Sequence, residues 1–304
     1  MINVYHFKNN YGDDLAWFIV SHLADDRLRY CIPFDWKRFV INFLIFARDA
    51  VFRRCFNTFP WPYSAQQDIL MVTGSLLGMA KKNCIVWGCG ITFSDDRPDP
   101  RAKIAAVRGP CTMKCVRAAG INSEGVATGD PGLLMPLLLP RRRKADFTLG
   151  IIAHINDVRK LSSDFRNDGD ILFITLDTRQ QSVESVTERI CSCEFIFSSS
   201  LHGLIIAHAY GIPALRIDSS NIPGDGVKFK DYLASVGIDF YEPFSSDRIA
   251  GLSPHQRTTL FHDRMSDALP GVDIKKIQIN LLKAAPFPLK PQFKELIRSQ
   301  TCHV

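Results

Sequence analysis

The chain has 304 residues, of which 46% are hydrophobic and 22% charged, and its formal net charge is +6 at pH 7. These values are ordinary for a globular protein and exclude a disordered chain, and the length suits two domains of about 140 residues each. The net charge is modest and no basic stretch carries a known nucleic-acid-binding signature, so we do not expect a nucleic acid as the partner.

Cysteine usage and hydropathy predict the compartment. Nine cysteines are scattered through the chain, and this odd number fits a reducing environment better than a disulfide framework. No apolar run reaches the roughly 18 residues of a membrane-spanning helix. The pairs Cys111/Cys115 and Cys191/Cys193 lack zinc-finger spacing, so no metal is expected. We therefore expect a cytoplasmic protein that binds anionic small molecules or a lipid surface.

Short apolar runs followed by turns recur in the first half of the chain. Ile2–Phe7 has the pattern of a strand, and a run at helical spacing follows it from Leu15 to Leu23. Ile69–Val72 and Cys84–Trp87 are further predicted strands, each followed by a turn that contains glycine. Strand, turn and helix in this order are typical of an α/β domain with a parallel sheet, where ligands bind beyond the carboxyl ends of the strands. We expect these turns to line one edge of the sheet.

The second half repeats this alternation. We predict an α/β fold of two Rossmann-like domains that face each other across a cleft, at residues 1–140 and 145–285, with a C-terminal helix within 286–304 that packs back on the first domain. The alternative is one large sheet with insertions. The predicted strands are Phe147–Ala153, Asp170–Leu176 and Pro213–Ile217, and the predicted helices are Ser182–Cys191, Phe229–Val236, the segment after Ser253 and Phe287–Ser299.

The stretch from Ser198 to Gly203 is the most informative part of the second half. It separates an apolar run that ends at Phe197 from a longer one at helical spacing, which predicts strand, turn and helix with Ser200 as the N-cap. Such a turn aims backbone N–H groups and the positive end of a helix dipole at one point, where a phosphate or carboxylate can bind. His202 lies in the first turn and is the leading catalytic candidate. A core histidine behind routine serine caps is the alternative.

Several short motifs occur in one order along the chain, and they are Asn10–Asp13, Trp87–Gly90, Val107–Pro110, Gly129–Pro131, Gly150–His154, Ser199–Gly203 and Lys228–Tyr232. Together they resemble the polysaccharide pyruvyl transferase family. Ser200 stands where many members of that family have arginine, and in this respect the chain is similar to the succinoglycan-type ketalases of exopolysaccharide loci.

The resemblance implies a fold like that of the GT-B glycosyltransferases, with residues 1–140 on the acceptor side and residues 145–285 on the donor side. It implies an enzyme that transfers the enolpyruvyl unit of phosphoenolpyruvate to sugar hydroxyls, releases phosphate and forms a pyruvate ketal on a polysaccharide or lipid-linked oligosaccharide precursor. Phosphoenolpyruvate is a co-substrate, and no cofactor is implied. Two alternatives are a nucleotide-sugar glycosyltransferase on the same fold and a non-catalytic sugar-binding protein of the envelope machinery.

Phosphoenolpyruvate carries about three negative charges, so its pocket needs fixed cations and N–H donors. Arg108 can hold a carboxylate or phosphate with a two-pronged contact, and Lys228 and Lys230 can supply point charges. Ser199 and Ser200 would add backbone donors at the start of the helix. Two alternatives stay open, namely a surface or interdomain ion pair for Arg108 and solvated charges for the two lysines.

Addition of a sugar hydroxyl to this donor needs a proton on the methylene carbon, and imidazole titrates near the working pH. His202 is the leading general acid and His154 the second candidate. Asp13 would accept a proton from the attacking hydroxyl or hold the sugar, and Asn10 and Gly12 complete the acceptor-side loop. The alternative for Gly12 and Asp13 is a role as turn formers. The chemistry needs protons and cations but no Lewis acid, so no metal site is predicted.

Residues 33–63 combine aromatic and basic side chains. They hold ten aromatic residues and five basic ones against two acids. This composition is typical of a helix that lies on an anionic membrane surface. Burial in the core or a dimer contact is the alternative, because the charges and the apolar residues share part of the helix surface. Our hypothesis is peripheral attachment to the inner face of the cytoplasmic membrane, through aromatic residues that include Trp36, Phe39, Phe43, Phe46, Phe52, Phe56 and Trp61.

Overall fold

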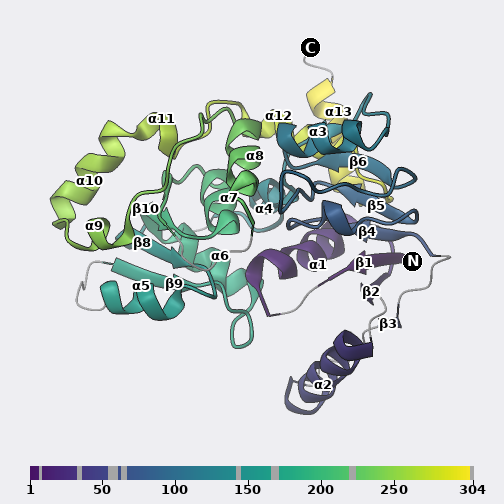
Figure 1. Ribbon diagram of the computed structural model, residues 1–304, viewed down its shortest axis with the longest axis horizontal. Helices are drawn as coiled ribbons and strands as arrows, with labels where there is room; N and C mark the ends of the chain where they lie inside the picture. Colours follow the sequence, from purple (N-terminus) through teal and green to yellow (C-terminus); the bar gives the residue numbers. More distant parts are fainter. Residues whose placement is uncertain are drawn as a thin grey trace.

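Two separate parallel sheets form the framework of the chain and lie side by side in Figure 1. The computed structural model describes residues 1–6, 9–32, 36–53, 61–62, 67–141, 145–165, 171–218 and 224–301. The first sheet has seven strands in the order β3-β2-β1-β4-β5-β6-β7, and they are β1 (Ile2–Tyr5), β2 (Leu28–Ile32), β3 (Trp61–Pro62), β4 (Ile69–Met71), β5 (Cys84–Trp87), β6 (Lys103–Val107) and β7 (Ala127–Thr128).

The second sheet has four strands in the order β11-β10-β8-β9, and they are β8 (Phe147–Ala153), β9 (Ile171–Thr175), β10 (Cys193–Ser198) and β11 (Ala214–Arg216). All neighbouring strands in both sheets run parallel. The predicted α/β class with parallel sheets is therefore confirmed. The alternative of one large sheet is wrong, because the described strands divide between two sheets. A pair of Rossmann-like domains across a cleft, with the predicted boundaries, stays a prediction.

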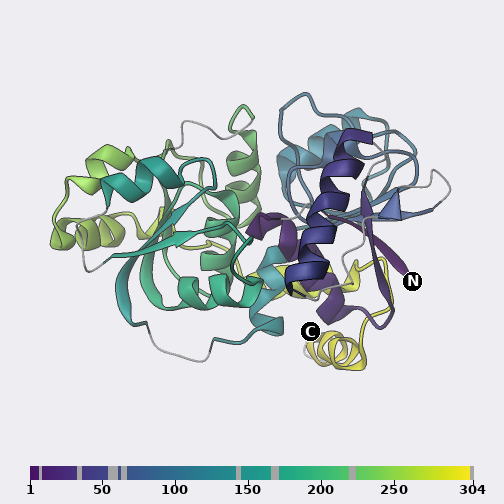
Figure 2. The same ribbon diagram turned by 90° about the horizontal axis from the view of Figure 1, so that it is seen from below.

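Helices pack on both sheets and connect their strands, while α2 stands apart from the sheets (Figures 1 and 2). Their first turns are fixed by local chemistry: Ser182 accepts a hydrogen bond from the Ser185 N–H, and Ser253 and Gln256 form a capping box. The α-helices are α1 (Tyr11–Leu23), α2 (Trp36–Arg53), α3 (Pro110–Ala118), α4 (Met135–Leu138), α5 (Val158–Asp164), α6 (Val183–Cys191), α7 (Leu201–Ala209), α8 (Val227–Ser235), α9 (Ser246–Ala250), α10 (Pro254–Asp263), α11 (Met265–Ala268), α12 (Ile274–Lys283) and α13 (Pro291–Thr301); the 3-10 helices are η1 (Leu77–Met79) and η2 (Pro131–Leu134).

Helix α7 is the central element between the two sheets. Every residue from Leu201 to His208 is buried, as expected for a helix that is apolar on all sides. One side packs on the second sheet and the other on η2 of the first half, where a Cβ atom on Gly132 would lie 2.9 Å from Ile205 Cγ2. The absence of a side chain at Gly132 therefore allows the close approach of α7.

The hydrophobic core continues from one sheet to the other. Polar contacts cross at the same place: the Tyr11 N–H donates to the Leu176 carbonyl (2.9 Å), and the Tyr11 and Thr187 hydroxyls lie 2.7 Å apart. The Trp87 indole N–H donates to the Leu281 carbonyl (3.0 Å). These contacts join the two halves into one packed body.

The end of the chain returns to the first sheet. Leu289 forms an isolated antiparallel bridge with Ala24, and the Lys290 N–H donates to the Leu23 carbonyl (2.9 Å). The Phe287 ring packs edge-on against the buried Trp87 ring, with centroids 5.2 Å apart. Residues from both ends of the chain thus share the packing around α1 and β5.

Candidate functional site

The candidate site lies where each sheet changes its winding direction. In the first sheet β1 and β4 are neighbours whose connections run to opposite sides, and in the second sheet β8 and β10 have this relation. Ligands in open parallel sheets bind at such points, beyond the carboxyl ends of the strands. The segments that follow these four strands contain residues 9–14, 73–75, 154–157 and 199–200, and the first of them includes the first turn of α1. They carry most of the predicted site residues.

Gly12 and His202 bring the two halves into direct contact. A Cβ atom on Gly12 would collide with the His202 ring, so only glycine leaves room for the imidazole at this position. Gly12 is the second residue of α1 and His202 the second residue of α7. The start of α1 therefore faces the start of α7. Gly12 is needed for this close approach to His202, which a role as a turn former alone does not explain.

The His202 side chain is buried, and its Nε2 atom has no hydrogen-bond partner among the described residues. The pKa of His202 is lowered to about 3, because burial disfavours its charged form and because Arg108 and Lys228 add positive charge nearby. The ring is therefore neutral near pH 7 in the free protein. A core histidine with satisfied nitrogens, the alternative considered from the sequence, does not fit the partnerless Nε2 atom.

His154 lies beside this contact at the end of β8. Its backbone N–H donates to Ser199 Oγ (3.0 Å), and its Nδ1 atom accepts from the Asn156 N–H (3.3 Å). The pKa of His154 is lowered, first by burial and then by Lys228, and Asp157 opposes this shift. Lys228 therefore acts on both histidines, which places the three side chains in one neighbourhood.

Asp13, in the first turn of α1, has a carboxyl group with a raised pKa. Burial and the negative charge of Asp14 raise its pKa to about 7, and the hydrogen bond from Asn10 Nδ2 to Asp13 Oδ2 (3.0 Å) opposes the shift. Asp14 lies against His6, with 2.7 Å between its Oδ1 atom and His6 Nε2, and accepts a hydrogen bond from the Thr178 hydroxyl of the second half. Asp13 thus titrates near neutral pH while its neighbour joins the two halves.

The serine turn differs from the prediction in its hydrogen bonds. Ser200 occupies the N-cap position of α7, but its side chain makes no capping bond. The Ser199 N–H donates to the Ile152 carbonyl (3.0 Å) and the Ser200 N–H to Ser198 Oγ (3.0 Å). The two predicted anion donors are therefore already used, because the turn stabilises itself. The first N–H of α7 with a carbonyl partner in the helix is that of Leu204, so the donors available to a ligand are those of residues 201–203.

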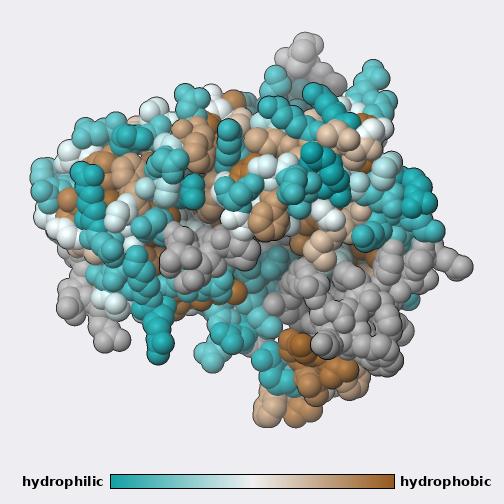
Figure 3. All heavy atoms as spheres, in the orientation of Figure 1, coloured by the Kyte–Doolittle hydropathy of each residue, from teal (hydrophilic) through white to brown (hydrophobic). Residues whose placement is uncertain are grey.

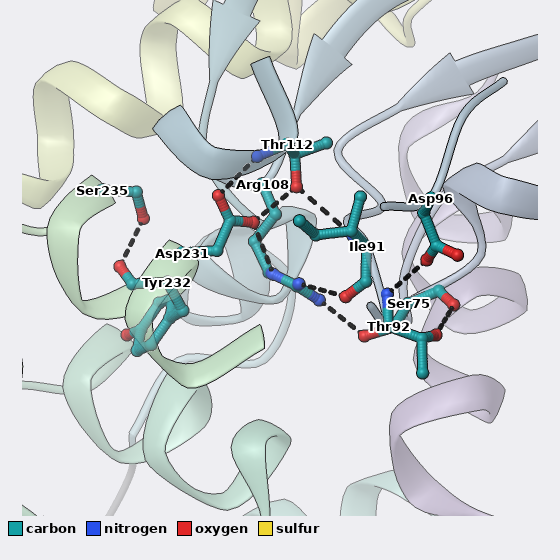
Figure 4. A network of polar contacts seen from close by, with 9 residues as sticks. All are labelled: Ser75, Ile91, Thr92, Asp96, Arg108, Thr112, Asp231, Tyr232 and Ser235. Atoms are coloured by element: carbon teal, nitrogen blue, oxygen red, sulfur yellow. Dashed lines mark hydrogen bonds and ion pairs between the residues drawn. The ribbon is translucent and has the colours of Figure 1, made fainter. Parts of the chain in front are cut away.

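Arg108 is wholly buried and holds three groups of the protein (Figure 4). Its Nε atom donates to Asp231 Oδ2 (3.2 Å), Nη1 to Ser75 Oγ (3.0 Å) and Nη2 to the Ile91 carbonyl (3.0 Å). The predicted two-pronged contact with a donor is not available in this arrangement. Of the two kinds of ion pair considered for Arg108, the surface pair is wrong, because both partners are fully buried, and the pair with Asp231 joins the two halves of the chain. The charge of Arg108 still acts on His202 through space.

Asp231 completes this network. Its Oδ1 atom accepts from the Thr112 N–H (2.9 Å) and its Oδ2 atom from the Thr112 hydroxyl (2.6 Å), so both oxygens are satisfied. Sequence reasoning missed Asp231, Thr112 and Ser75. The available signals were the position of Asp231 inside the Lys228–Tyr232 motif and that of Ser75 in a glycine turn after a strand.

The two predicted lysines of α8 point to different places. Residues two apart on a helix lie about 200° apart around its axis, and only Lys228 acts on the histidines. The pKa of Lys228 is lowered to about 8 by burial and by the charges of Arg108 and Arg216. Lys230 is exposed and lines a surface pocket with Cys111 and Lys114. The grouping of Lys230 with Lys228 at one donor site is therefore corrected.

A second carboxyl group with a raised pKa lies behind Arg108. Asp130 is fully buried and caps η2, since its Oδ1 atom accepts from the Gly132 N–H (2.8 Å). Its Oδ2 atom has no partner among the described residues, and burial raises the pKa of Asp130 to about 6. In the part of the chain that the structure describes, no group of three or more His, Cys, Asp or Glu side chains is arranged to hold a metal ion.

Comparisons with known proteins bear on the family. A family model described as polysaccharide pyruvyl transferase matches residues 10–221. An uncharacterized protein of Acanthamoeba polyphaga mimivirus is 28% identical over 170 residues, which are 55% of this chain and 59% of that relative. The chain thus spans 59% of the length of this curated relative. A structure of the wall teichoic acid polymerase TagF covers 93% of this chain and 88% of its own, with a TM-score of 0.41 and 12% identity.

Replacement of Asp231 by alanine should destabilise the protein strongly. The change leaves the Arg108 charge buried without its carboxylate, a loss of about 3–5 kcal/mol in the free energy of unfolding, measured by urea denaturation. Asp99→Ala is the matched control, because Asp99 pairs with Arg101 on the surface and its loss should change the stability little. Equal effects of the two substitutions would contradict the importance of the buried pair.

Proposed function

The chain belongs to the polysaccharide pyruvyl transferase family, and from this premise we propose that it transfers the pyruvyl unit of phosphoenolpyruvate to a sugar of a polysaccharide or lipid-linked oligosaccharide precursor. The product is a cyclic ketal and the released group is phosphate. The observation that carries the proposal is the contact between Gly12 and His202, which sets an imidazole with a partnerless nitrogen beside the Asp13 loop. The GT-B-like arrangement of acceptor and donor domains is part of the same proposal.

The charges around His202 favour a small polyanion. Lys228 has a pKa of about 8 because burial and the neighbouring cations Arg108 and Arg216 disfavour a further positive charge. A donor with a carboxylate and a phosphate would neutralise this field. The first turn of α7 would add backbone N–H groups and the positive end of its dipole. Lys228 is therefore the residue that we assign to direct donor contact, and Arg108 acts at longer range.

The chemistry follows in two additions at the same carbon. In the first, a sugar hydroxyl adds to C2 of phosphoenolpyruvate while an acid protonates C3. C3 becomes a methyl group, and the C2–C3 double bond becomes a single bond. In the second, another hydroxyl of the sugar attacks C2 and the C–O bond to phosphate breaks. The sugar releases two hydroxyl protons in all. One restores the acid that protonated C3, and the other leaves with the phosphate. The net reaction converts the donor and a diol into a ketal and phosphate.

His202 is assigned as the general acid of the first step. In the free protein its ring is neutral, because burial and nearby cations lower its pKa to about 3. A bound trianion reverses the sign of the local field and raises that pKa, so the proton arrives together with the donor. Asp13 is assigned as the base that accepts the hydroxyl proton, since a carboxyl with a pKa of about 7 releases and takes up protons near neutral pH.

The test is to incubate the protein with phosphoenolpyruvate and a panel of lipid-linked and aryl glycosides, and to measure phosphate release and the mass gain of a pyruvyl unit. We expect His202→Asn to lower kcat by about 100-fold or more, the usual effect of removing a general acid. His255→Asn, at an exposed position of α10, is the control and should retain full activity.

Other outcomes distinguish the alternatives. Thermal stabilisation by a nucleotide and not by phosphoenolpyruvate would favour a nucleotide-sugar glycosyltransferase. A folded protein that binds glycosides and releases no phosphate with any acceptor would favour a non-catalytic sugar-binding role. Full activity of His202→Asn would overturn the assignment of the acid.

The two lysines of α8 allow a matched comparison. Lys228→Ala should raise the KM for phosphoenolpyruvate about 10- to 100-fold, because it removes a charge-assisted contact of about 1.5–3 kcal/mol. Lys230→Ala removes the same charge from the opposite side of the helix and should leave KM nearly unchanged. If both substitutions raise KM equally, the effect is a general change of surface charge and the assignment of Lys228 fails.

The raised pKa of Asp13 predicts the pH dependence. Asp13 is protonated below about pH 7 and cannot act as a base there, so kcat/KM should fall about tenfold per pH unit below that value. Asp13→Asn should lower the rate at pH 8 and abolish the fall of kcat/KM below pH 7, which is the acid limb of the pH profile. Asp95→Asn, at an exposed position, is the control. An unchanged acid limb in Asp13→Asn would assign the titration to another group.

A further inference from the structure

Helix α2 projects from the body of the molecule. In Figure 1 it lies below the first sheet, and in Figure 2, seen from below, it crosses in front of that half. Several of its apolar side chains are open to solvent, and Figure 3 shows them as a hydrophobic surface at the lower end of the molecule. The exposed apolar side chains described on α2 are Val40, Ile41, Phe43, Leu44, Val51 and Phe52.

The burial of α2 is the reverse of that in an ordinary surface helix. Val40, Leu44 and Val51 fall on one stripe of the helix, and Leu44 is 63% and Val51 73% exposed. Asp49 lies on another side and is only 6% exposed, with its carboxylate accepting two hydrogen bonds from Arg48. The alternative that this helix is buried in the core is therefore wrong for these side chains. The side chains of Trp36, Phe39, Phe56 and Trp61 lie outside the described residues.

An exposed apolar stripe of this kind indicates a contact surface. The charges at the two ends of the helix indicate whether the partner is a second copy of α2 or an anionic surface. In the sequence, Lys37 and Arg38 belong to the first turn of α2, Arg53 is its last residue, and Arg54 is the next residue of the chain. Two copies of the helix packed against each other, parallel or antiparallel, would bring basic residues against basic residues at both ends. An anionic surface complements both ends at once, so charge favours such a surface over a second copy.

We propose that α2 docks the protein on a lipid bilayer that contains anionic headgroups. The apolar stripe enters the boundary between headgroups and acyl chains, and the basic residues at the two ends contact the phosphates. Within the described ranges, no helix is long and apolar enough to cross a membrane.

This docking is independent of the proposed reaction, since no residue of α2 belongs to the site around His202. A protein that failed to transfer pyruvate could still bind the bilayer, and the reverse also holds. The two proposals are therefore tested by different measurements, vesicle binding in one case and phosphate release in the other.

The test is flotation of the full chain with vesicles of phosphatidylcholine alone or mixed with phosphatidylglycerol. We expect binding to the mixed vesicles that is at least tenfold stronger than binding to the neutral ones and that weakens as salt is raised. Leu44→Asp combined with Val51→Asp should reduce flotation at least tenfold. These side chains are exposed, so the double variant should fold, and circular dichroism checks this.

Matched controls separate docking from general changes. Val272→Asp alters an exposed valine outside α2 and should float like the parent. Arg53→Glu combined with Arg54→Glu should lose the preference for anionic vesicles. Equal flotation of the parent and the Leu44/Val51 variant would overturn the proposal. So would a dimer in light scattering that dissociates in this variant while the parent fails to float, because the stripe would then be a contact between two copies.

Discussion

The arrangement of the site depends on the ion pair between Arg108 and Asp231. Two fully buried charges carry a desolvation penalty of several kcal/mol each, which is tolerated only when their hydrogen bonds are satisfied. Thr112, Ser75 and the Ile91 carbonyl meet that condition here. Because Asp231 is on α8 and Arg108 follows β6, the pair fixes α8 against the first half. That position directs Lys228 toward the histidines and turns Lys230 away from them.

Burial, and after it the neighbouring cations, lowers the pKa of both His202 and Lys228 in the free protein. Arg108 and Lys228 lower the pKa of His202, and Arg108 and Arg216 lower that of Lys228, each together with burial. In the reaction that we propose, an anionic donor beside these cations would therefore raise the pKa of the imidazole as it binds.

Much of this was predictable from local patterns in the sequence. Apolar runs with glycine or serine turns identified β8, β10 and α7, because buried parallel strands and helix starts have short-range signals. The loop at Asn10–Asp13 and the turn before His202 were assigned to the site because parallel strands present their carboxyl ends at one edge. The sequence also sufficed to predict that Lys228 and Lys230 point to different sides of α8, because this depends only on the helical period.

The sequence by itself determined the α/β class, the family and the set of loops that gather at the ends of the strands, since these depend on local periodicity and motif order. Only the tertiary structure decided that Arg108 pairs with a carboxylate 123 residues away, that the Ser199 and Ser200 amides are used within the turn, and that α2 turns its apolar stripe outward. The physical reason is that hydrogen-bond partners and burial are set by which distant segments meet, and that information is absent from any local stretch of the chain.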